Sequence, residues 1–183
     1  MFTFTKTKFE GVYLITPHIV SDVRGFFLET YHKTEFMKYG LDQEFVQDNQ
    51  SLSYQGVLRG LHYQVGCSAQ GKLVRCVWGE IYDVVVDIRT NSSTFSEWFG
   101  ITLAENQQML YVPIGFAHGF YTVSQQAIVN YKTTHEYAPE TERGILWNDP
   151  DIKINWPTLN PLLSNKDQKY PLLKEIDLKD LFS

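Results

Sequence analysis

The chain has 183 residues, of which 43% are hydrophobic, so it is long enough for one well-cored domain and too short for two ordinary ones. Sixteen Lys and Arg residues stand against 21 Asp and Glu residues, and the formal net charge of −5 argues against broad electrostatic attraction to nucleic acid or to an anionic membrane. Any anionic ligand must therefore be bound by local positive charge.

The N-terminal segment and the cysteines bear on the cellular location. Residues 1–8 alternate Phe, Thr and Lys without an apolar core of signal-peptide length, and no stretch approaches the roughly 20 apolar residues of a membrane span. The two cysteines, Cys67 and Cys76, have no second Cys or His pair at zinc spacing, so the sequence supports neither a disulfide framework nor a structural zinc site. We expect a cytoplasmic protein with reduced thiols.

Strand-like runs follow one another at short spacing, which is typical of a β-sandwich or β-barrel. The aromatic content of 15% also suits sheets better than a helical bundle. In chain order the runs are residues 11–16, 25–31, 44–51, 57–64, 72–78, 80–89, 96–103, 108–112, 119–123 and 127–134. The break at residues 78–80 predicts a hairpin, with residues 82, 84, 86 and 88 on one face of its second strand and 83, 85, 87 and 89 on the other.

Helices are expected only at the periphery. One short helix is predicted over residues 33–39, before Gly40, and a second over residues 172–181. From about residue 137 prolines and polar residues become frequent, so this part should wrap the sheets in irregular form. We expect a single all-β domain over residues 1–183, with short peripheral helices and an irregular C-terminal wrap.

An arginine and a histidine lie three positions apart in the apolar run 57–64. Imidazole exchanges a proton near neutral pH and guanidinium binds anionic groups, so the pair suggests proton transfer on an anionic ligand. In a regular strand Arg59 and His62 would point to opposite faces. We hypothesise that a β-bulge at Gly60 brings both side chains to one face. Taken alone, His62 is also compatible with a structural histidine.

Three further side chains are candidates for chemistry. His118 lies in a Pro- and Gly-containing turn that enters a strand, and Lys72, at the mouth of a strand, could balance a phosphate or an oxyanion. Tyr131 could present a phenol as a proton donor. Each also has a plain structural interpretation, as a turn histidine, a solvated strand end and a packed tyrosine. The position two after His62 is Gln64 rather than histidine, and we expect no bound metal.

A series of motifs runs in order along the chain, within a stretch of similarity from about residue 9 to about residue 173. They are Asp22-Val23-Arg24-Gly25-Phe26-Phe27, Phe45-Val46-Gln47-Asp48-Asn49, Gly56-Val57-Leu58-Arg59-Gly60-Leu61-His62-Tyr63-Gln64, Gln70-Gly71-Lys72-Leu73-Val74-Arg75, Gly115-Phe116-Ala117-His118-Gly119-Phe120, Tyr131-Lys132-Thr133-Thr134, Ile145-Leu146-Trp147-Asn148-Asp149-Pro150, Ile154-Asn155-Trp156-Pro157 and Leu163-Ser164-Asn165-Lys166-Asp167. In these motifs the chain resembles the dTDP-4-dehydrorhamnose 3,5-epimerase family. The loop at residues 65–69 matches no motif, and its effect should be confined to substrate fit.

The resemblance implies a fold, a partner and a reaction. It implies a metal-free, cupin-like jelly roll, a double-stranded β-helix barrel, which forms a homodimer by strand exchange and uses no cofactor. It also implies that dTDP-4-keto-6-deoxyglucose is inverted at C3 and C5 through an enolate, giving dTDP-4-keto-rhamnose for dTDP-rhamnose biosynthesis.

Carried over by motif, the resemblance also implies residue roles. His62 would be the base, held by Asp167; Tyr131 would be the acid that returns a proton; and Lys72 would stabilise the enolate. The residues that would hold nucleotide, diphosphate or sugar are Arg24, Glu29, Gln47, Asn49, Arg59, His118, Glu142 and Lys166. Asp167 lies 105 residues after His62, so their contact is a prediction about how the C-terminal segment folds back.

The chemistry is consistent with such residues. A 4-ketone acidifies the protons on both neighbouring carbons, so a base on one face and an acid on the other can invert each centre. A positioned acid–base pair contributes roughly 10²- to 10⁴-fold, so the enolate's charge must also be stabilised, a role that suits Lys72. Two alternatives stay open: an epimerase of another nucleotide-deoxysugar that inverts only C3 or C5, and a non-catalytic sugar-binding β-barrel. A pure binder would need neither His62 nor Tyr131.

Overall fold

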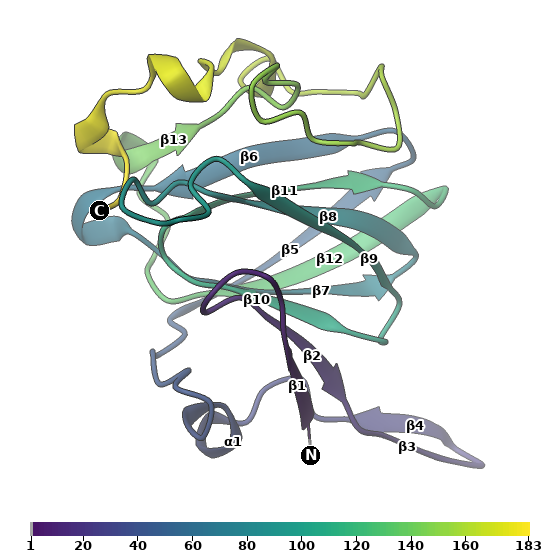
Figure 1. Cartoon of the computed structure of the whole chain (residues 1–183). Coiled ribbons are helices and arrows are strands. Elements are labelled where there is room, and N and C mark those ends of the chain that lie inside the picture. The colour runs from purple at the N-terminus through teal and green to yellow at the C-terminus, as the bar shows by residue number, and fades with distance from the viewer. Residues whose placement is uncertain (1) are drawn as a thin grey trace.

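The structure is a computed structural model that describes residues 2–183, and its regular secondary structure is mainly antiparallel strands, most of them in two facing sheets (Figure 1). The six-stranded sheet has the order β1 (Phe2–Lys6), β2 (Tyr13–Pro17), β10 (Met109–Val112), β7 (Lys72–Trp78), β12 (Gln126–Thr133) and β5 (Gln47–Tyr54). The five-stranded sheet has the order β13 (Glu142–Gly144), β6 (Leu58–Gln64), β11 (Phe116–Thr122), β8 (Glu80–Asp87) and β9 (Trp98–Ala104). The predicted all-β class is confirmed.

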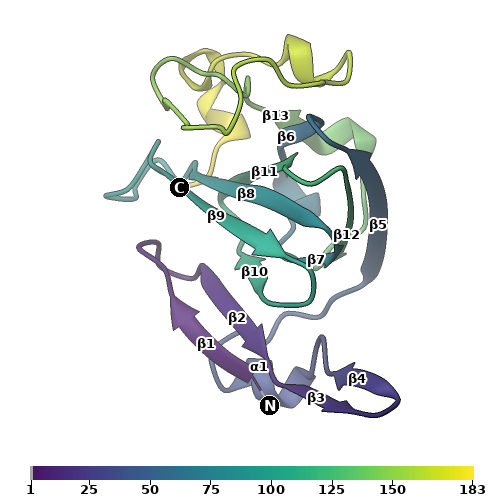
Figure 2. The same ribbon diagram turned by 90° about the vertical axis from the view of Figure 1, so that its right-hand side faces the viewer.

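A separate hairpin, formed by β3 (Ile19–Asp22) and β4 (Gly25–Leu28), extends away from the barrel (Figures 1 and 2). The prediction of one strand over residues 25–31 is therefore too long, and β3 and β1 were not predicted. The alternation of Phe and Thr in β1 is a period-two strand signal, and it pairs with β2 along its whole length.

The core has one layer between the sheets and further apolar clusters on their outer faces. Val85 packs between the sheets with Val74 and Val129, whereas Val84 and Val86 face outward into a second buried cluster. This alternation is the one predicted for the second strand of the hairpin, and both faces are buried because the C-terminal wrap covers the five-stranded sheet (Figure 2). The wrap is thus packed on the barrel.

The helical predictions met different outcomes. Helix α1 (Lys33–Met37) forms within the predicted range, and its Phe36 is buried on the outer face of the six-stranded sheet. The predicted helix over residues 172–181 is wrong, because that segment contains two separate 3₁₀ turns, η4 (Leu173–Glu175) and η5 (Leu178–Asp180). Its backbone bonds to other parts of the chain instead. Leu173 N–H donates to Asp149 Oδ2 within the wrap at 2.7 Å. Just after the segment, Phe182 N–H donates to the carbonyl of Ile88, next to the end of β8, at 3.3 Å.

Strand β6 contains the bulge that was hypothesised at Gly60. His118 on β11 pairs with His62, and Phe120 pairs with Arg59, so three steps along β6 match two steps along β11. Gly60 has φ of +132°, and a Cβ there would lie 2.5 Å from the Cα of Gly119. Only glycine fits this close approach. The extra residue places Arg59 and His62 on the same side of the sheet, and both line one cavity.

Candidate active site

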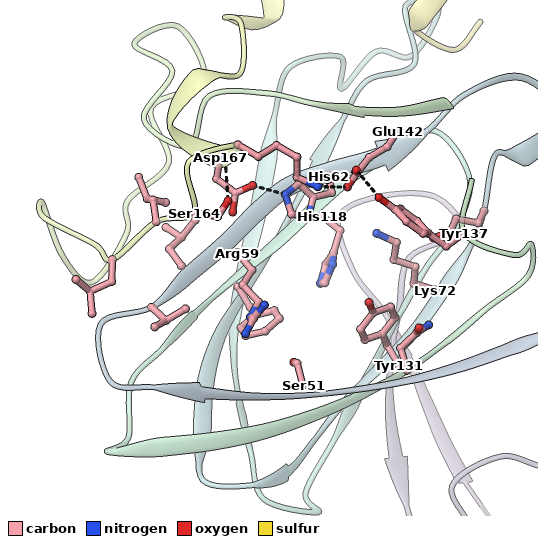
Figure 3. A pocket seen from close by; sticks show the side chains of 18 of the residues that line it. Ser51, Arg59, His62, Lys72, His118, Tyr131, Tyr137, Glu142, Ser164 and Asp167 are labelled. Carbon is pink, nitrogen blue, oxygen red and sulfur yellow. Dashed lines mark hydrogen bonds and ion pairs between the residues drawn. The ribbon is translucent and has the colours of Figure 1, made fainter. Parts of the chain in front are cut away.

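A cavity of about 660 Å³ lies between the two sheets and is closed on one side by the C-terminal wrap (Figure 3). It brings together residues from strands of both sheets with residues of the wrap. The predicted site residues that line it are Gln47, Asn49, Arg59, His62, Lys72, His118, Tyr131, Glu142, Lys166 and Asp167. Arg24 and Glu29 do not line it. Arg24 lies in the turn of the β3–β4 hairpin and Glu29 directly after it.

His62 and Asp167 form a hydrogen-bonded pair at the edge of the cavity. The His62 Nε2 to Asp167 Oδ1 distance is 2.6 Å, and the side chains are 25% and 3% exposed. Burial by itself would raise the pKa of Asp167, but the hydrogen bond and charge of His62, with help from Ser164, hold that pKa below its usual value. Asp167 is therefore ionised at neutral pH. The predicted contact is confirmed, while the catalytic roles stay predictions.

Lys72 and Tyr131 face His62 from the opposite side of the cavity (Figure 3). Burial lowers the pKa of Lys72 to about 8, although the charges of Glu142 and Asp83 oppose this shift. Burial also raises the pKa of Tyr131, and the charge of Arg59 partly offsets the effect. At neutral pH the cavity thus holds an ammonium group and a protonated phenol opposite an imidazole.

Arg59 provides a guanidinium that is held in place by the neighbouring strand. Its Nε donates a hydrogen bond to Ser53 Oγ at 2.9 Å, and its Nη2 donates to the Leu52 carbonyl at 3.2 Å. Both acceptors are neutral, so these two hydrogen bonds do not neutralise the positive charge of Arg59. The arrangement suits binding of an anionic group.

A second histidine–aspartate pair lies deeper in the cavity wall. His118 Nε2 is 3.0 and 2.9 Å from the two carboxylate oxygens of Asp83, and Asp83 is fully buried. Asp83 was not among the predicted site residues. The available signal was a carboxylate flanked by apolar residues on the inward face of β8, since Asp83 has the parity of Ile81 and Val85.

Glu142 joins β13 to the wrap at the mouth of the cavity. Lys166 Nζ donates to its two oxygens at 2.8 and 2.7 Å, and Tyr137 Oη donates at 2.9 Å. Burial by itself would raise the pKa of Glu142, but the bonds from Lys166 and Tyr137 hold that pKa below its usual value. Tyr137, which also contacts Gln47 through its backbone N–H at 2.8 Å, is a cavity residue that sequence reasoning missed. It lies in the irregular segment, where no periodicity marks an inward position.

Within residues 2–183 no group of three or more His, Cys, Asp or Glu side chains lies together as metal ligands do, and no helix is long and apolar enough to cross a membrane. The predictions that no metal and no cofactor take part stay predictions. Cys67 is an exposed free thiol and Cys76 a buried one.

Known proteins resemble this chain along nearly its whole length. The sequence model of the dTDP-4-dehydrorhamnose 3,5-epimerase family matches residues 6–175. The chain belongs to this family. The family member from Methanothermobacter thermautotrophicus is 48% identical over 178 residues, which cover 95% of this chain and 96% of the relative. A 3,5-epimerase from Legionella pneumophila, solved in complex with dTDP-4-keto-L-rhamnose, superposes with a TM-score of 0.96 at 43% identity and covers 100% of this chain and 98% of that one.

A relative with a narrower name also matches. The dTDP-4-dehydrorhamnose 3-epimerase of Streptomyces niveus is 41% identical over 168 residues, which cover 91% of this chain and 81% of the relative. Membership in the family confirms the predicted cupin-like jelly roll and the predicted class of enzyme, an isomerase of nucleotide-sugar metabolism in the dTDP-rhamnose pathway.

Proposed function

We propose that this epimerase inverts both C3 and C5 of dTDP-4-keto-6-deoxyglucose and releases dTDP-4-keto-rhamnose in the cytoplasm. One observation carries the proposal: a carboxylate-bound imidazole faces a phenol and an ammonium group across one cavity. This is the set of groups that proton removal on one face, proton return on the other and stabilisation of an enolate require. The 3,5-epimerase names of the similar proteins support the substrate class.

His62 removes the proton from carbon. With Asp167 ionised, its carboxylate accepts a hydrogen bond from Nε2–H of His62, which leaves Nδ1 as the unprotonated nitrogen. When Nδ1 takes the proton, the C–H electron pair moves toward the C4 carbonyl and gives an enolate. The imidazolium that forms is stabilised by the Asp167 carboxylate, as in other histidine–carboxylate pairs.

Lys72 and Tyr131 complete each inversion. The Lys72 ammonium stabilises the negative charge on the enolate oxygen, and its burial strengthens this interaction because little water screens it. Tyr131 then donates its phenolic proton to the same carbon from the opposite face, and solvent restores the proton of Tyr131 and removes that of His62. Repetition at the second carbon gives the doubly inverted sugar.

Ligand binding falls to the remaining cavity residues. Arg59 binds the diphosphate, because its guanidinium faces the cavity with only neutral acceptors from its own neighbourhood. The side chains of Gln47, Asn49, His118, Glu142 and Lys166 hold the nucleotide or the sugar.

Arg24 and Glu29 serve the cavity of a second copy in a homodimer formed by strand exchange. The hairpin that carries Arg24 extends from its own barrel (Figure 2). It exposes large apolar side chains. The exposed fractions are 55% for Val20, 57% for Phe26 and 68% for Phe27. An apolar surface of this kind on a projecting hairpin supports burial against a partner.

Subunit complementation tests this dimer. Arg24→Ala should raise KM about 10- to 100-fold, because an exposed arginine that binds diphosphate is lost. A heterodimer of Arg24→Ala and His62→Ala chains, isolated with two affinity tags, should regain about half of the wild-type activity, since one of its two sites is then intact. If the hairpin served its own barrel instead, the heterodimer would contain no intact site and would show no such recovery.

Deuterium labelling tests the reaction. The protein is incubated with dTDP-4-keto-6-deoxyglucose in D₂O, and label at C3 and C5 is followed by NMR. We expect label at both carbons and the rhamnose configuration in the product. Label at one carbon only would assign the chain to single-site epimerases, the class named for the Streptomyces niveus relative. Bound ligand without label at either carbon would indicate a non-catalytic binding barrel.

A further inference from the structure

On the β13 side of β6, the strand position opposite His62 has no side chain. Gly144 on β13 pairs with His62 on β6 in the antiparallel ladder. Residues paired in this way normally have Cβ atoms about 4.5–5.5 Å apart, so a side chain at position 144 would pack beside the imidazole. Glycine leaves that space to another part of the chain.

The ring of Tyr170 occupies the space. A Cβ placed on Gly144 would lie 2.5 Å from ring carbons of Tyr170, so any larger residue would displace this ring. The Tyr170 ring packs edge-to-face with His62, with ring centroids 5.6 Å apart and an interplanar angle of 66°. Tyr170 is not among the residues that line the cavity, so its ring contacts the imidazole on the side away from the cavity.

The same short segment supplies both neighbours of His62. Asp167 begins the 3₁₀ turn η3 (Asp167–Lys169), and Tyr170 follows that turn directly. The segment docks along the chain that begins at β13: Lys166 binds Glu142, and Leu146 N–H donates to the Pro171 carbonyl at 2.8 Å. The Tyr170–Gly144 contact lies between these two attachments. It therefore influences where both the carboxylate and the aromatic ring meet the imidazole.

We propose that Tyr170 is a positioning residue for the base, and that its ring, seated over Gly144, fixes the orientation of the His62 imidazole between Asp167 and the cavity. The inference rests on the proposed role of His62. It assigns the effect to the ring rather than to the hydroxyl, because the ring is the part of Tyr170 that packs against the imidazole and fills the space over Gly144. Tyr170 touches no reacting atom, so its loss acts on the chemical step through His62.

Steady-state kinetics of Tyr170→Ala and Tyr170→Phe provide the first test. Tyr170→Ala should lower kcat about 10- to 100-fold, because small misplacement of a catalytic group has effects of this size, while KM stays within about threefold. Tyr170→Phe keeps the ring and should retain wild-type kcat. Leu173→Ala is the matched control, since Leu173 anchors the same segment in the outer apolar cluster. It should lower the melting temperature and leave kcat of the folded protein unchanged.

Gly144→Ala provides the second test. In the wild-type background the new methyl group should displace the Tyr170 ring and lower kcat, whereas in the Tyr170→Ala background it should add little further loss. Such non-additivity is expected of groups in contact and not of distant, independent sites. Independent, multiplicative losses in the double variant would overturn the proposal, as would equal kcat losses in Tyr170→Ala and Leu173→Ala.

An NMR readout separates this inference from the proposed reaction. In ¹⁵N-histidine-labelled protein, the Nε2–H signal of His62 should be sharp in wild type and in Tyr170→Phe, and broadened or lost in Tyr170→Ala. An unchanged signal in Tyr170→Ala would overturn the positioning role whether or not the protein turns over substrate. Absence of deuterium labelling by the wild-type protein would instead overturn the proposed function, and the NMR comparison would still decide the role of Tyr170.

Discussion

Two histidine–aspartate pairs face the same cavity but are assembled differently. His118 and Asp83 lie on β11 and β8, neighbouring strands of one sheet, and the His118 side chain is only 8% exposed. His62 lies on β6, and Asp167 reaches it from the C-terminal wrap; the His62 side chain is 25% exposed. Strand register is sufficient to form the first pair. The second forms only when the wrap docks on the barrel.

The difference in accessibility separates their roles. A pair that is almost wholly buried keeps a fixed arrangement and suits the binding of a ligand group. A histidine that remains partly accessible can exchange its proton with solvent between turnovers, which the base must do twice for a double inversion. We therefore propose that the wrap supplies the carboxylate for proton transfer and that the sheet supplies the carboxylate for binding.

Removing the charge of the wrap-borne carboxylate should have the largest effect in this comparison. In Asp167→Asn the amide N–H can donate a hydrogen bond to His62 Nε2, which favours the imidazole tautomer that cannot act as the base. The substitution also removes the charge that stabilises the imidazolium. We expect kcat to fall roughly 10²- to 10⁴-fold with little change in KM. Steady-state kinetics check this. A rise in KM with unchanged kcat would mean that Asp167 acts in binding, as we propose for the other pair.

Lys72 links the two pairs, because the charge of Asp83 acts on it and its ammonium faces His62 across the cavity. Lys72→Met should lower kcat about 10²-fold by removing the positive charge near the enolate. Because burial disfavours the charged form, the same change should raise the melting temperature by about 2–6 °C at neutral pH. Kinetics and thermal unfolding measure the two effects. A fall in both activity and stability would contradict the role of Lys72 as a desolvated cation.

The pH profile gives a related prediction of smaller size. Burial lowers the pKa of Lys72 to about 8, so the ammonium is lost as the pH rises through that value. We expect kcat/KM, which reports the free enzyme, to fall up to about tenfold for each pH unit above about 8. In Lys72→Arg the cation persists, and any remaining activity should lack this alkaline limb. An unchanged limb would assign it to another group.

The smallest effect on rate is expected for the carboxylate within the sheet. Asp83→Asn should raise KM up to about tenfold and leave kcat within about threefold, because His118 keeps its place but loses its charged partner. Thermal unfolding should show a loss of stability, since the hydrogen bond between His118 and a buried carboxylate is weakened and hydrogen bonds to charged groups contribute about 1.5–3 kcal/mol. A kcat loss as large as that of Asp167→Asn would erase the distinction between the pairs.

Local features of this site were predictable from the sequence. The bulge at Gly60 places Arg59 and His62 on one face, and it was inferred from strand parity and a single glycine. Asp83 was predicted to share a face with Val85, although its pairing with His118 was not foreseen. In such cases the determining residues lie within one strand, so the two-residue alternation of side chains along that strand predicts which face each of them occupies.

Non-local features were predictable only through the resemblance. His62 and Asp167 are 105 residues apart, and this separation does not predict that they are in contact. The wrap is irregular, so no periodicity in its sequence predicts which of its side chains face the barrel. Tyr137 and Tyr170 lie in that wrap and were missed for the same reason. Arg24 lies outside the cavity of its own chain, and nothing in the pattern of a single sequence predicts the homodimer in which we propose that it acts.

The central claim is that one base, His62, serves both carbons. His62→Ala should be incubated with dTDP-4-keto-6-deoxyglucose in D₂O beside the wild-type protein, with binding of the ligand checked separately. The account predicts that exchange at C3 and at C5 is abolished together while the ligand still binds. Normal exchange at either carbon in His62→Ala would contradict it, because a second base would then be acting at that centre.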